Sequence, residues 1–390
     1  MIAIKRHMLR CIKKFMSRHL SRHISNMPID DKKIKSTDKD QKCKAKAGVC
    51  DTKKPEFSSY DYFLPDRKGD VQVSIIGGSD ATIYTAALLK QSRLIKRIHL
   101  VDMNDLFMSP VLDASHIDTS ARLKCFKRKN LKEALKETNI IALMDERNVN
   151  MDCDLNIAAQ FGAASAYVHK MAEKMVQFCS NSLVAVFARP VTATLPMVSE
   201  IYKHAKWWDP DRIIGSTALD HMRMEAITAN LLDLNPAFLS VPVVGGADTS
   251  TIVPLLSRTT PASGFTNEQT ELLLRSFRNA DRELANSGSK GSLSDAAAAA
   301  KLILTLAGGL CGFENIVASA YVRSNVLPVC RFFTSQLQFG TGGVKKNFGL
   351  PKMSSSEILL VEQAIPVIND CIEMAAKAVH CNGDVIMKNA

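Results

Sequence analysis

Two adjacent glycines and a carboxylate occur in this sequence in an arrangement that suits nucleotide binding. The β-branched run Val71–Gly77 (VQVSIIG) is typical of a buried strand and leads directly into Gly78. Residues 84–90 fit a helix, and residues 97–101 (RIHLV) fit a second strand that ends at Asp102. A strand, a glycine turn, a helix and a strand ending in an acid form the layout of a dinucleotide-binding βαβ unit. In such a unit the turn receives a pyrophosphate and the acid binds a ribose.

The glycine turn departs from the dinucleotide fingerprint, which has glycines at its first, third and sixth positions. Here the turn reads Gly77-Gly78-Ser79-Asp80. A carboxylate about 5 Å from a phosphate repels it by roughly 3 kcal/mol at an effective dielectric constant near 20, which weakens binding about a hundredfold. The sequence leaves open whether Asp80 points into the turn or caps the following helix from outside.

Further strand-like runs alternate with helical stretches along the same half of the chain. They lie at residues 139–144 (NIIALM), 183–188 (LVAVFA) and 213–215. Alternation of strands and helices favours a parallel sheet covered by helices. We therefore predict an α/β fold built on a Rossmann-type, doubly wound parallel sheet.

Composition and charge argue against several other classes of protein. The formal net charge of +11 is concentrated in residues 1–68, which hold 18 Lys and Arg against 8 Asp and Glu. A nucleic-acid-binding domain carries its basic patch on the fold, so no nucleic-acid partner is predicted. No uninterrupted apolar run reaches 18 residues, which predicts no membrane span. The ten cysteines are scattered without CxxC spacing, which predicts no metal site and no disulfide framework.

The first 29 residues have the composition of a targeting sequence. They contain seven Lys and Arg and no acid, and their apolar residues recur at helical spacing. This pattern is typical of a mitochondrial transit peptide and predicts a mitochondrial matrix protein, with a disordered basic arm as the alternative. Residues 30–69 mix both charges with Ser, Thr and Pro, which predicts a disordered linker.

Five other stretches are distinctive: Leu112–Thr119 (LDASHIDT), Arg189–Pro196 (RPVTATLP), Arg212–Arg223 (RIIGSTALDHMR), Val241–Ser257 (VPVVGGADTSTIVPLLS) and Gly343–Ser354 (GVKKNFGLPKMS). Together they resemble the NAD-dependent malate dehydrogenases of mitochondrial type, in the lactate/malate dehydrogenase superfamily. The resemblance implies a Rossmann NAD-binding-like domain at residues 70–214, an α+β catalytic domain of the lactate/malate dehydrogenase type at 215–382, and a tail at 383–390. It also implies NAD as cofactor, a dimer, and the interconversion of (S)-malate and oxaloacetate in the tricarboxylic acid cycle.

The resemblance assigns roles to individual residues, and part of the family's site is kept. Asp220 matches the aspartate that orients the catalytic histidine, and Arg223, one helical turn later, matches a carboxylate-binding arginine. Ala247 stands where the family has its proton-accepting histidine. The glycine turn and Asp102 fall at the cofactor-binding positions.

The substrate-binding positions depart further from the family pattern. Asp152 stands where a substrate-binding arginine is expected, and a second such arginine falls near Glu146, with Arg147 as a candidate stand-in. Arg189 replaces the asparagine that orients the reacting oxygen, and the run 296–300 replaces a serine- and methionine-bearing turn near the nicotinamide. Asp152 and Arg189 either pair across the emptied pocket or are each solvated separately.

Other side chains are poor substitutes for the missing base. His221 follows Asp220 directly, so on a helix it points about 100° away, and Asp248 would serve only if its loop rotated. We therefore predict an inactive or severely impaired family member, a pseudoenzyme with a structural or partner-subunit role. It would form homodimers or mixed dimers with an active relative. The alternative is an active malate dehydrogenase or a weak 2-hydroxy-acid oxidoreductase.

Overall fold

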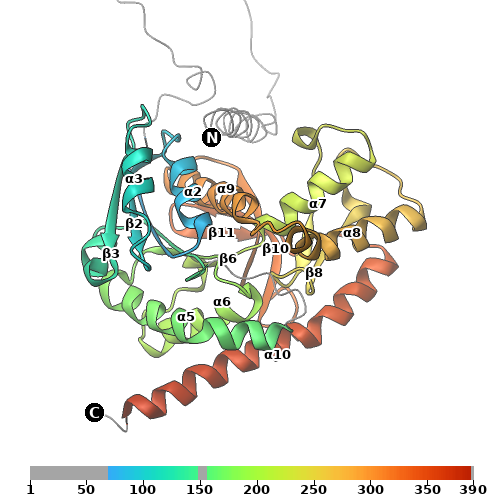
Figure 1. Cartoon of the computed structure of the whole chain (residues 1–390). Helices are drawn as coiled ribbons and strands as arrows, with labels where there is room; N and C mark the ends of the chain where they lie inside the picture. The colour runs from blue at the N-terminus through green and yellow to red at the C-terminus, as the bar shows by residue number, and fades with distance from the viewer. Residues whose placement is uncertain (1–68, 148–155, 388–390) are drawn as a thin grey trace, which may run out of the picture. The chain divides into compact units, whose positions relative to one another are not determined.

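A single mixed sheet runs through the part of the chain that the structure, a computed structural model, describes (Figure 1). The described residues are 69–147 and 156–387, with side chains described as far as His380. The strand order is β3-β2-β1-β4-β5-β6-β9-β10-β7-β8, and β11 also pairs with β10. The strands are β1 (Val71–Gly77), β2 (Ile95–Asp102), β3 (Arg122–Lys127), β4 (Ile140–Leu143), β5 (Leu183–Val186), β6 (Ile213–Ser216), β7 (Val243–Gly245), β8 (Ile252–Pro254), β9 (Ile316–Arg323), β10 (Phe332–Gly340) and β11 (Gly343–Asn347).

The first six strands are parallel and have the order of a doubly wound dinucleotide-binding sheet. Every residue of β1, β4 and β5 is buried, as expected for Val-, Ile- and Leu-rich strands with helices on both faces. The strand order reverses between β1 and β4, which is where such sheets bind ligands. The α/β prediction is confirmed. The helices of this half are α2 (Asp80–Leu89), α3 (Met108–Ser115), α4 (Leu131–Leu135), α5 (Ile157–Cys179) and α6 (Val191–His204).

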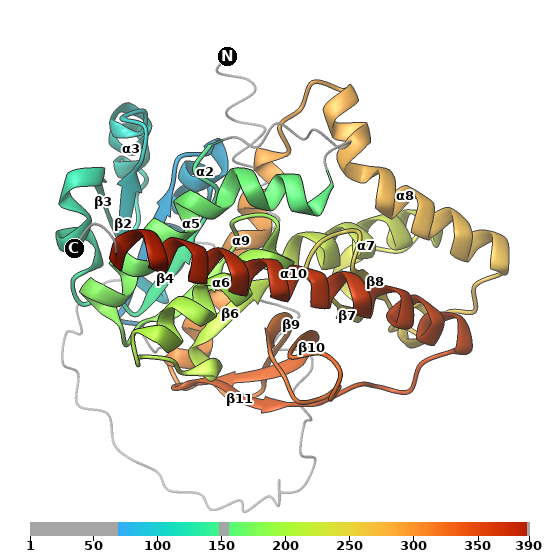
Figure 2. The same ribbon diagram turned by 90° about the horizontal axis from the view of Figure 1, so that it is seen from below.

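The second half continues the same sheet with antiparallel strands. β9 pairs antiparallel with β6, and β10 pairs antiparallel with β9, β7 and β11. The helices here are α7 (Ala218–Leu231), α8 (Asn267–Asn286), α9 (Ser292–Leu310) and α10 (Ser355–Met387). Figure 2 shows α10 running across the molecule, where it packs against α6, α5, β7 and β8. A single hydrophobic cluster therefore includes residues of both halves, from Ile76 to Ile368.

Helix α9 is the one described helix that is long and apolar enough to cross a membrane. In this fold 61% of its apolar stretch is buried, and it packs against α2 and α7. We therefore assign it as a core helix.

The predicted strands lie within two residues of the observed bounds, and two helices differ by more. Helix α2 begins at Asp80 and not at residue 84, because extended Ser79 is its N-cap. Helix α10 continues to Met387 and so into the predicted tail, because residues after the single Gly383 are compatible with a helix. The predicted transit peptide, the linker apart from Gly69, and Asp152 lie outside the described residues.

Candidate active site

A cavity of about 1260 Å³ lies at the carboxyl ends of the parallel strands. Met144 and Asp145 follow β4 into its wall, Arg189 follows β5, and Ser216 ends β6. Helices α7, α8 and α9 supply the opposite wall. Seven residues singled out in the sequence line this one cavity: Glu146, Arg147, Arg189, Asp220, Arg223, Ala247 and Asp248.

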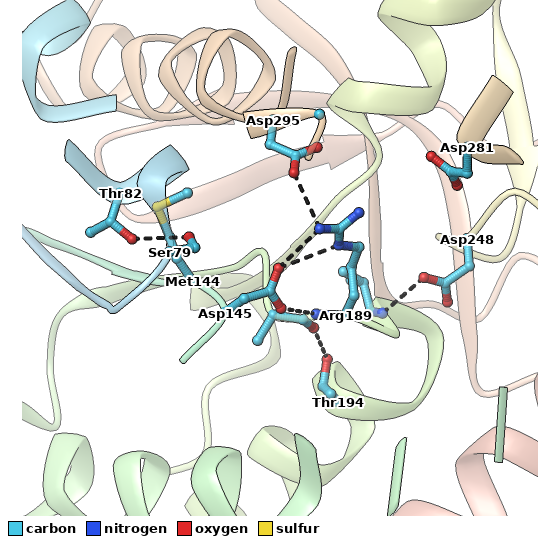
Figure 3. A network of polar contacts seen from close by, with 12 residues as sticks. Ser79, Thr82, Met144, Asp145, Arg189, Thr194, Asp248, Asp281 and Asp295 are labelled. Atoms are coloured by element: carbon cyan, nitrogen blue, oxygen red, sulfur yellow. Dashed lines mark hydrogen bonds and ion pairs between the residues drawn. The ribbon is translucent and has the colours of Figure 1, made fainter. Parts of the chain in front are cut away.

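Arg189 is held between two aspartates from different parts of the fold (Figure 3). Its backbone N–H donates to Asp145 Oδ1 at 2.9 Å, and its Nε and Nη2 each lie 3.3 Å from Asp145 Oδ2. Nη2 also lies 3.2 Å from Oδ2 of Asp295, in the first turn of α9. The predicted partner, Asp152, lies outside the described residues, so that pairing remains a prediction.

The electrostatics of this trio follow from its burial. Burial raises the pKa of Asp145 and of Asp295, although the Arg189 guanidinium opposes both shifts. Burial by itself would lower the pKa of Arg189, but the two carboxylates outweigh it and raise that pKa. The three groups therefore form an ionic cluster in which one guanidinium is shared by two carboxylates.

Asp248 serves as a cap for helix α6. Its Oδ1 accepts the Val191 N–H at 3.0 Å and its Oδ2 accepts the Thr192 N–H at 2.9 Å. These N–H groups have no acceptor within the helix, and the helix N-terminus stabilises a carboxylate that accepts from them. Burial raises the pKa of Asp248, and the Thr192 contacts oppose that shift. The neighbouring Ala247 donates its backbone N–H to Thr192 Oγ1 at 3.0 Å, so both residues fix the β7–β8 loop to α6.

Asp220 and Arg223 lie on one face of α7 and both reach the cavity, as predicted. Asp220 is 5% exposed, and its Oδ1 accepts a hydrogen bond from the Thr249 hydroxyl at 3.0 Å. Burial raises the pKa of Asp220 to about 7, with the Arg223 guanidinium opposing the shift. Arg223 Nη1 lies 2.7 Å from Asp281 Oδ1 of α8, so a protein carboxylate contacts this guanidinium. The predicted orientation of His221 agrees with its Nε2 lying 3.4 Å from Glu225 Oε1.

The glycine turn and Asp102 lie together at the carboxyl ends of β1 and β2, but their polar groups are used within the protein. The Gly78 N–H donates to the Asp145 carbonyl oxygen at 3.0 Å. Asp102 is 2% exposed and accepts the backbone N–H groups of Asn104 at 3.0 Å and Phe107 at 2.6 Å. The Asn104 amide donates to the carbonyl oxygens of Gly78 at 3.3 Å and Glu146 at 3.1 Å. Asn104 therefore links the ends of β1, β2 and β4.

These contacts crowd the turn between β1 and α2. A Cβ added to Gly78 would overlap the Glu146 carbonyl oxygen and the Asn104 amide, so the space over this glycine is occupied. Asp80 is 45% exposed in the first turn of α2 and lies 3.5 Å from Lys290 Nζ, so it points outward from the turn. The Gly78 N–H and the Asp102 carboxylate, at the expected cofactor-binding positions, both have protein partners in this arrangement.

Comparison with known proteins supports the same fold assignment. Residues 217–379 match the model of the lactate/malate dehydrogenase α/β C-terminal domain. Mitochondrial malate dehydrogenase of Homo sapiens is 30% identical over 317 residues, which cover 80% of this chain and 92% of that protein. The chain belongs to the lactate/malate dehydrogenase family. A malate dehydrogenase of the bacterium Photorhabdus laumondii is 28% identical over 315 residues, 80% of this chain and 100% of the relative.

Solved structures of the lactate/malate dehydrogenase family share the fold. Malate dehydrogenase of Cryptosporidium parvum superposes with a TM-score of 0.67 at 17% identity, over 79% of this chain and 99% of that one. Plasmodium falciparum malate dehydrogenase in complex with NADH superposes with a TM-score of 0.64 at 17% identity, over 80% of this chain and 100% of that one. At these identities the similarity concerns the fold alone.

The sequence did not single out three of the aspartates that fill this family member's cavity. Asp145 lies directly after a buried strand, and Asp295 immediately precedes the alanine run in α9. Asp281 lies in the middle of α8, among other charged residues. The position of Asp145 at a strand's carboxyl end was a usable signal. Asp281 and Asp295 gave none, because only the packing of α8 and α9 brings them to the two arginines.

Proposed function

We propose that this family member is a non-catalytic protein of the mitochondrial matrix that acts as a structural or partner subunit. The observation that carries the proposal is the environment of Asp220. Its oxygen accepts a hydrogen bond from Thr249 beside Ala247, where malate oxidation requires an imidazole. The described lining of the cavity holds no histidine or lysine that would take over as the base.

The family's reaction moves a hydride from the C2 carbon of malate to NAD and a proton from the C2 hydroxyl to a base. Three carboxylates of this cavity are already engaged, because Asp248 caps α6 and Asp145 and Asp295 contact Arg189. Loss of a general base alone lowers a rate roughly 10²- to 10⁴-fold. Arg223, at a carboxylate-binding position, and Arg189, in place of the orienting asparagine, already contact aspartates, which supports a still larger loss.

NAD is the family's cofactor, and we propose that this chain binds it weakly or not at all. The support comes from Gly78 and Asp102, whose polar groups are hydrogen-bonded to other parts of the protein, and from Asn104 over the turn. Opening this crevice would break the two hydrogen bonds of the Asn104 amide before the cofactor contributed any contact.

The proposed cellular context rests on the relatives and on exposed surfaces. The mitochondrial relatives and the basic N-terminus support the matrix location. Around α3, the side chains of Leu106, Met108 and Leu112 are each more than half exposed, which favours a protein partner. We propose a homodimer or a mixed dimer with an active relative, with domains at residues 70–214 and 215–382.

The test is oxaloacetate-dependent NADH oxidation by the purified chain at high protein concentration, with an active mitochondrial malate dehydrogenase assayed alongside. We expect no detectable rate from a folded protein. An Ala247→His variant is expected to stay inactive, because the cofactor crevice and both arginines remain occupied. A wild-type rate within about tenfold of the control, equal to about 1.4 kcal/mol of barrier, would overturn the proposal.

Co-expression with an active relative tests the partner role separately. Recovery of a mixed dimer, identified by native mass spectrometry, is the expected result. Self-association alone would leave the homodimer and exclude the mixed assembly.

A further inference from the structure

The cavity contains more buried negative than positive charge. Five aspartates and two arginines lie in its inner wall: Asp145, Asp220, Asp248, Asp281, Asp295, Arg189 and Arg223. The other arginines of the lining, at positions 147, 278 and 282, are exposed, so solvent and salt screen them strongly. The family's site accepts a dianion, whereas this inner wall favours a cation.

Four of these aspartates directly contact an arginine or a helix N-terminus, whereas no such contact reaches Asp220 among the described residues. Arg189 contacts Asp145 and Asp295, Arg223 contacts Asp281, and Asp248 lies on the N-terminus of α6. Asp220 has only the Thr249 hydroxyl, at Oδ1, as a hydrogen-bond donor among the described residues. No described residue donates to its second oxygen, and the side chain, which is 95% buried, lines the cavity. A carboxylate oxygen that faces a cavity can accept a hydrogen bond from a ligand that enters it.

Asp220 faces a cavity of about 1260 Å³. Ala247 lines the same cavity and its side chain ends at Cβ. Farther along the wall, Ala298 and Met374 offer apolar surface. A ligand that suits this arrangement has a flat cationic end with N–H donors and a small apolar body.

We propose that the cavity binds a small organic cation of the amidinium, guanidinium or imidazolium class, seated against Asp220 in the space beside Ala247. The paired N–H donors of such a group match a carboxylate and make a charge-assisted contact. The inference rests on the proposed loss of catalysis, because an active dehydrogenase would need the same space for a dicarboxylate. A dicarboxylate would have to displace Asp281 from Arg223, or Asp145 and Asp295 from Arg189.

Binding of this cation depends on pH in a defined direction. Burial raises the pKa of Asp220 to about 7; Asp248 and Asp281 add to the shift, and Arg223 opposes it. A bound cation favours the ionised carboxylate and lowers this pKa, so binding releases a proton. Affinity therefore rises as the pH increases through about 7.

The experiment is isothermal titration calorimetry of the full-length protein with benzamidine, whose amidinium stays charged across the neutral range, and with succinate as the dianionic probe. We expect one benzamidine site, no succinate site and tighter benzamidine binding at higher pH. Asp220→Asn keeps the shape and removes the charge, and it is expected to weaken the affinity roughly tenfold or more. Glu314→Gln removes an exposed acid outside the cavity lining and is the matched control, with unchanged affinity expected.

A second variant keeps the proposal testable if Asp220→Asn does not fold. Ala247→Leu keeps Asp220 charged but fills the space beside it, and it is also expected to abolish benzamidine binding while circular dichroism stays native. Succinate binding in place of benzamidine, or benzamidine binding that neither variant changes, would overturn the cation site. An inactive protein that ignores benzamidine would overturn this site alone, whereas a protein that oxidises NADH would overturn the proposed function.

Discussion

Replacing Arg189 with methionine removes the charge that holds Asp145 and Asp295 together. At separations of 3.3 and 3.2 Å, each contact is worth about 5 kcal/mol of Coulomb attraction at an effective dielectric constant near 20, before desolvation is subtracted. Removal of one partner from a buried pair typically costs about 3–5 kcal/mol. The three side chains keep 14–23% exposure, so we expect a smaller loss of unfolding free energy, about 2–4 kcal/mol.

The pH dependence of this loss distinguishes an ionic role from a packing role. Without Arg189 the folded-state pKa of both aspartates rises further above the unfolded value, so the protonated forms are favoured in the fold. Stability is then lost as the pH rises from the unfolded to the folded pKa, so the deficit of the variant is larger at pH 8 than at pH 5.

Thermal melting followed by circular dichroism measures both effects. We expect the melting temperature of Arg189→Met to fall by roughly 5–10 °C at neutral pH. Arg258→Gln, which removes the same charge from an exposed site, is expected to leave it unchanged. The double variant Arg189→Met with Asp295→Leu should recover part of the loss. Equal melting temperatures for Arg189→Met and Arg258→Gln across the pH range would refute the ionic cluster.

Further predictions concern the rest of the fold. The Glu357 carboxylate accepts three hydrogen bonds, two of them from Ser257, and these outweigh its burial and lower its pKa. Its contribution to stability is therefore present above the unfolded pKa and lost as the pH falls through the folded pKa; Glu357→Gln should flatten an acid-unfolding curve, and an unchanged curve would contradict this. Gly78→Ala should cost about 2–3 kcal/mol because its Cβ would overlap the Glu146 carbonyl oxygen. Gly162→Ala, on the exposed face of α5 with open space around it, should stabilise by about 0.5–1 kcal/mol in urea unfolding, and a reversed order of these two glycine variants would contradict the crowding.

The sequence predicted the elements that local patterns determine. β1 was predicted with its observed bounds, because an unbroken β-branched run next to a glycine turn specifies a buried strand. The family resemblance singled out Asp220 and Arg223, and their spacing of three residues placed them on one face of a helix, which is α7. The start of α2 was missed, because the polar residues Ser79 and Asp80 were interpreted as part of the turn.

Local sequence patterns could not predict the hydrogen-bond and ion-pair partners of the site residues. The sequence suggested Asp152 as an ion-pair partner of Arg189. The described partners are Asp145, 44 positions before it, and Asp295, 106 positions after it. The sequence could show that Asp248 is next to the lost histidine, but not that its carboxylate is directed at the N-terminus of α6. Such contacts form when elements that are distant in the sequence pack together, so no local sequence pattern predicts them.

The mutual dependence of Arg189, Asp145 and Asp295 also bears on how this protein can evolve. Removing the charge of one of these residues leaves a buried charge without its partner, so a neutral exchange requires the others to change with it. On the proposed function, replacing Ala247 with histidine alone would gain nothing while the cluster persists. Single substitutions toward a dehydrogenase would therefore be either destabilising or without benefit, and new uses of the fold would be more accessible to this chain than that reaction.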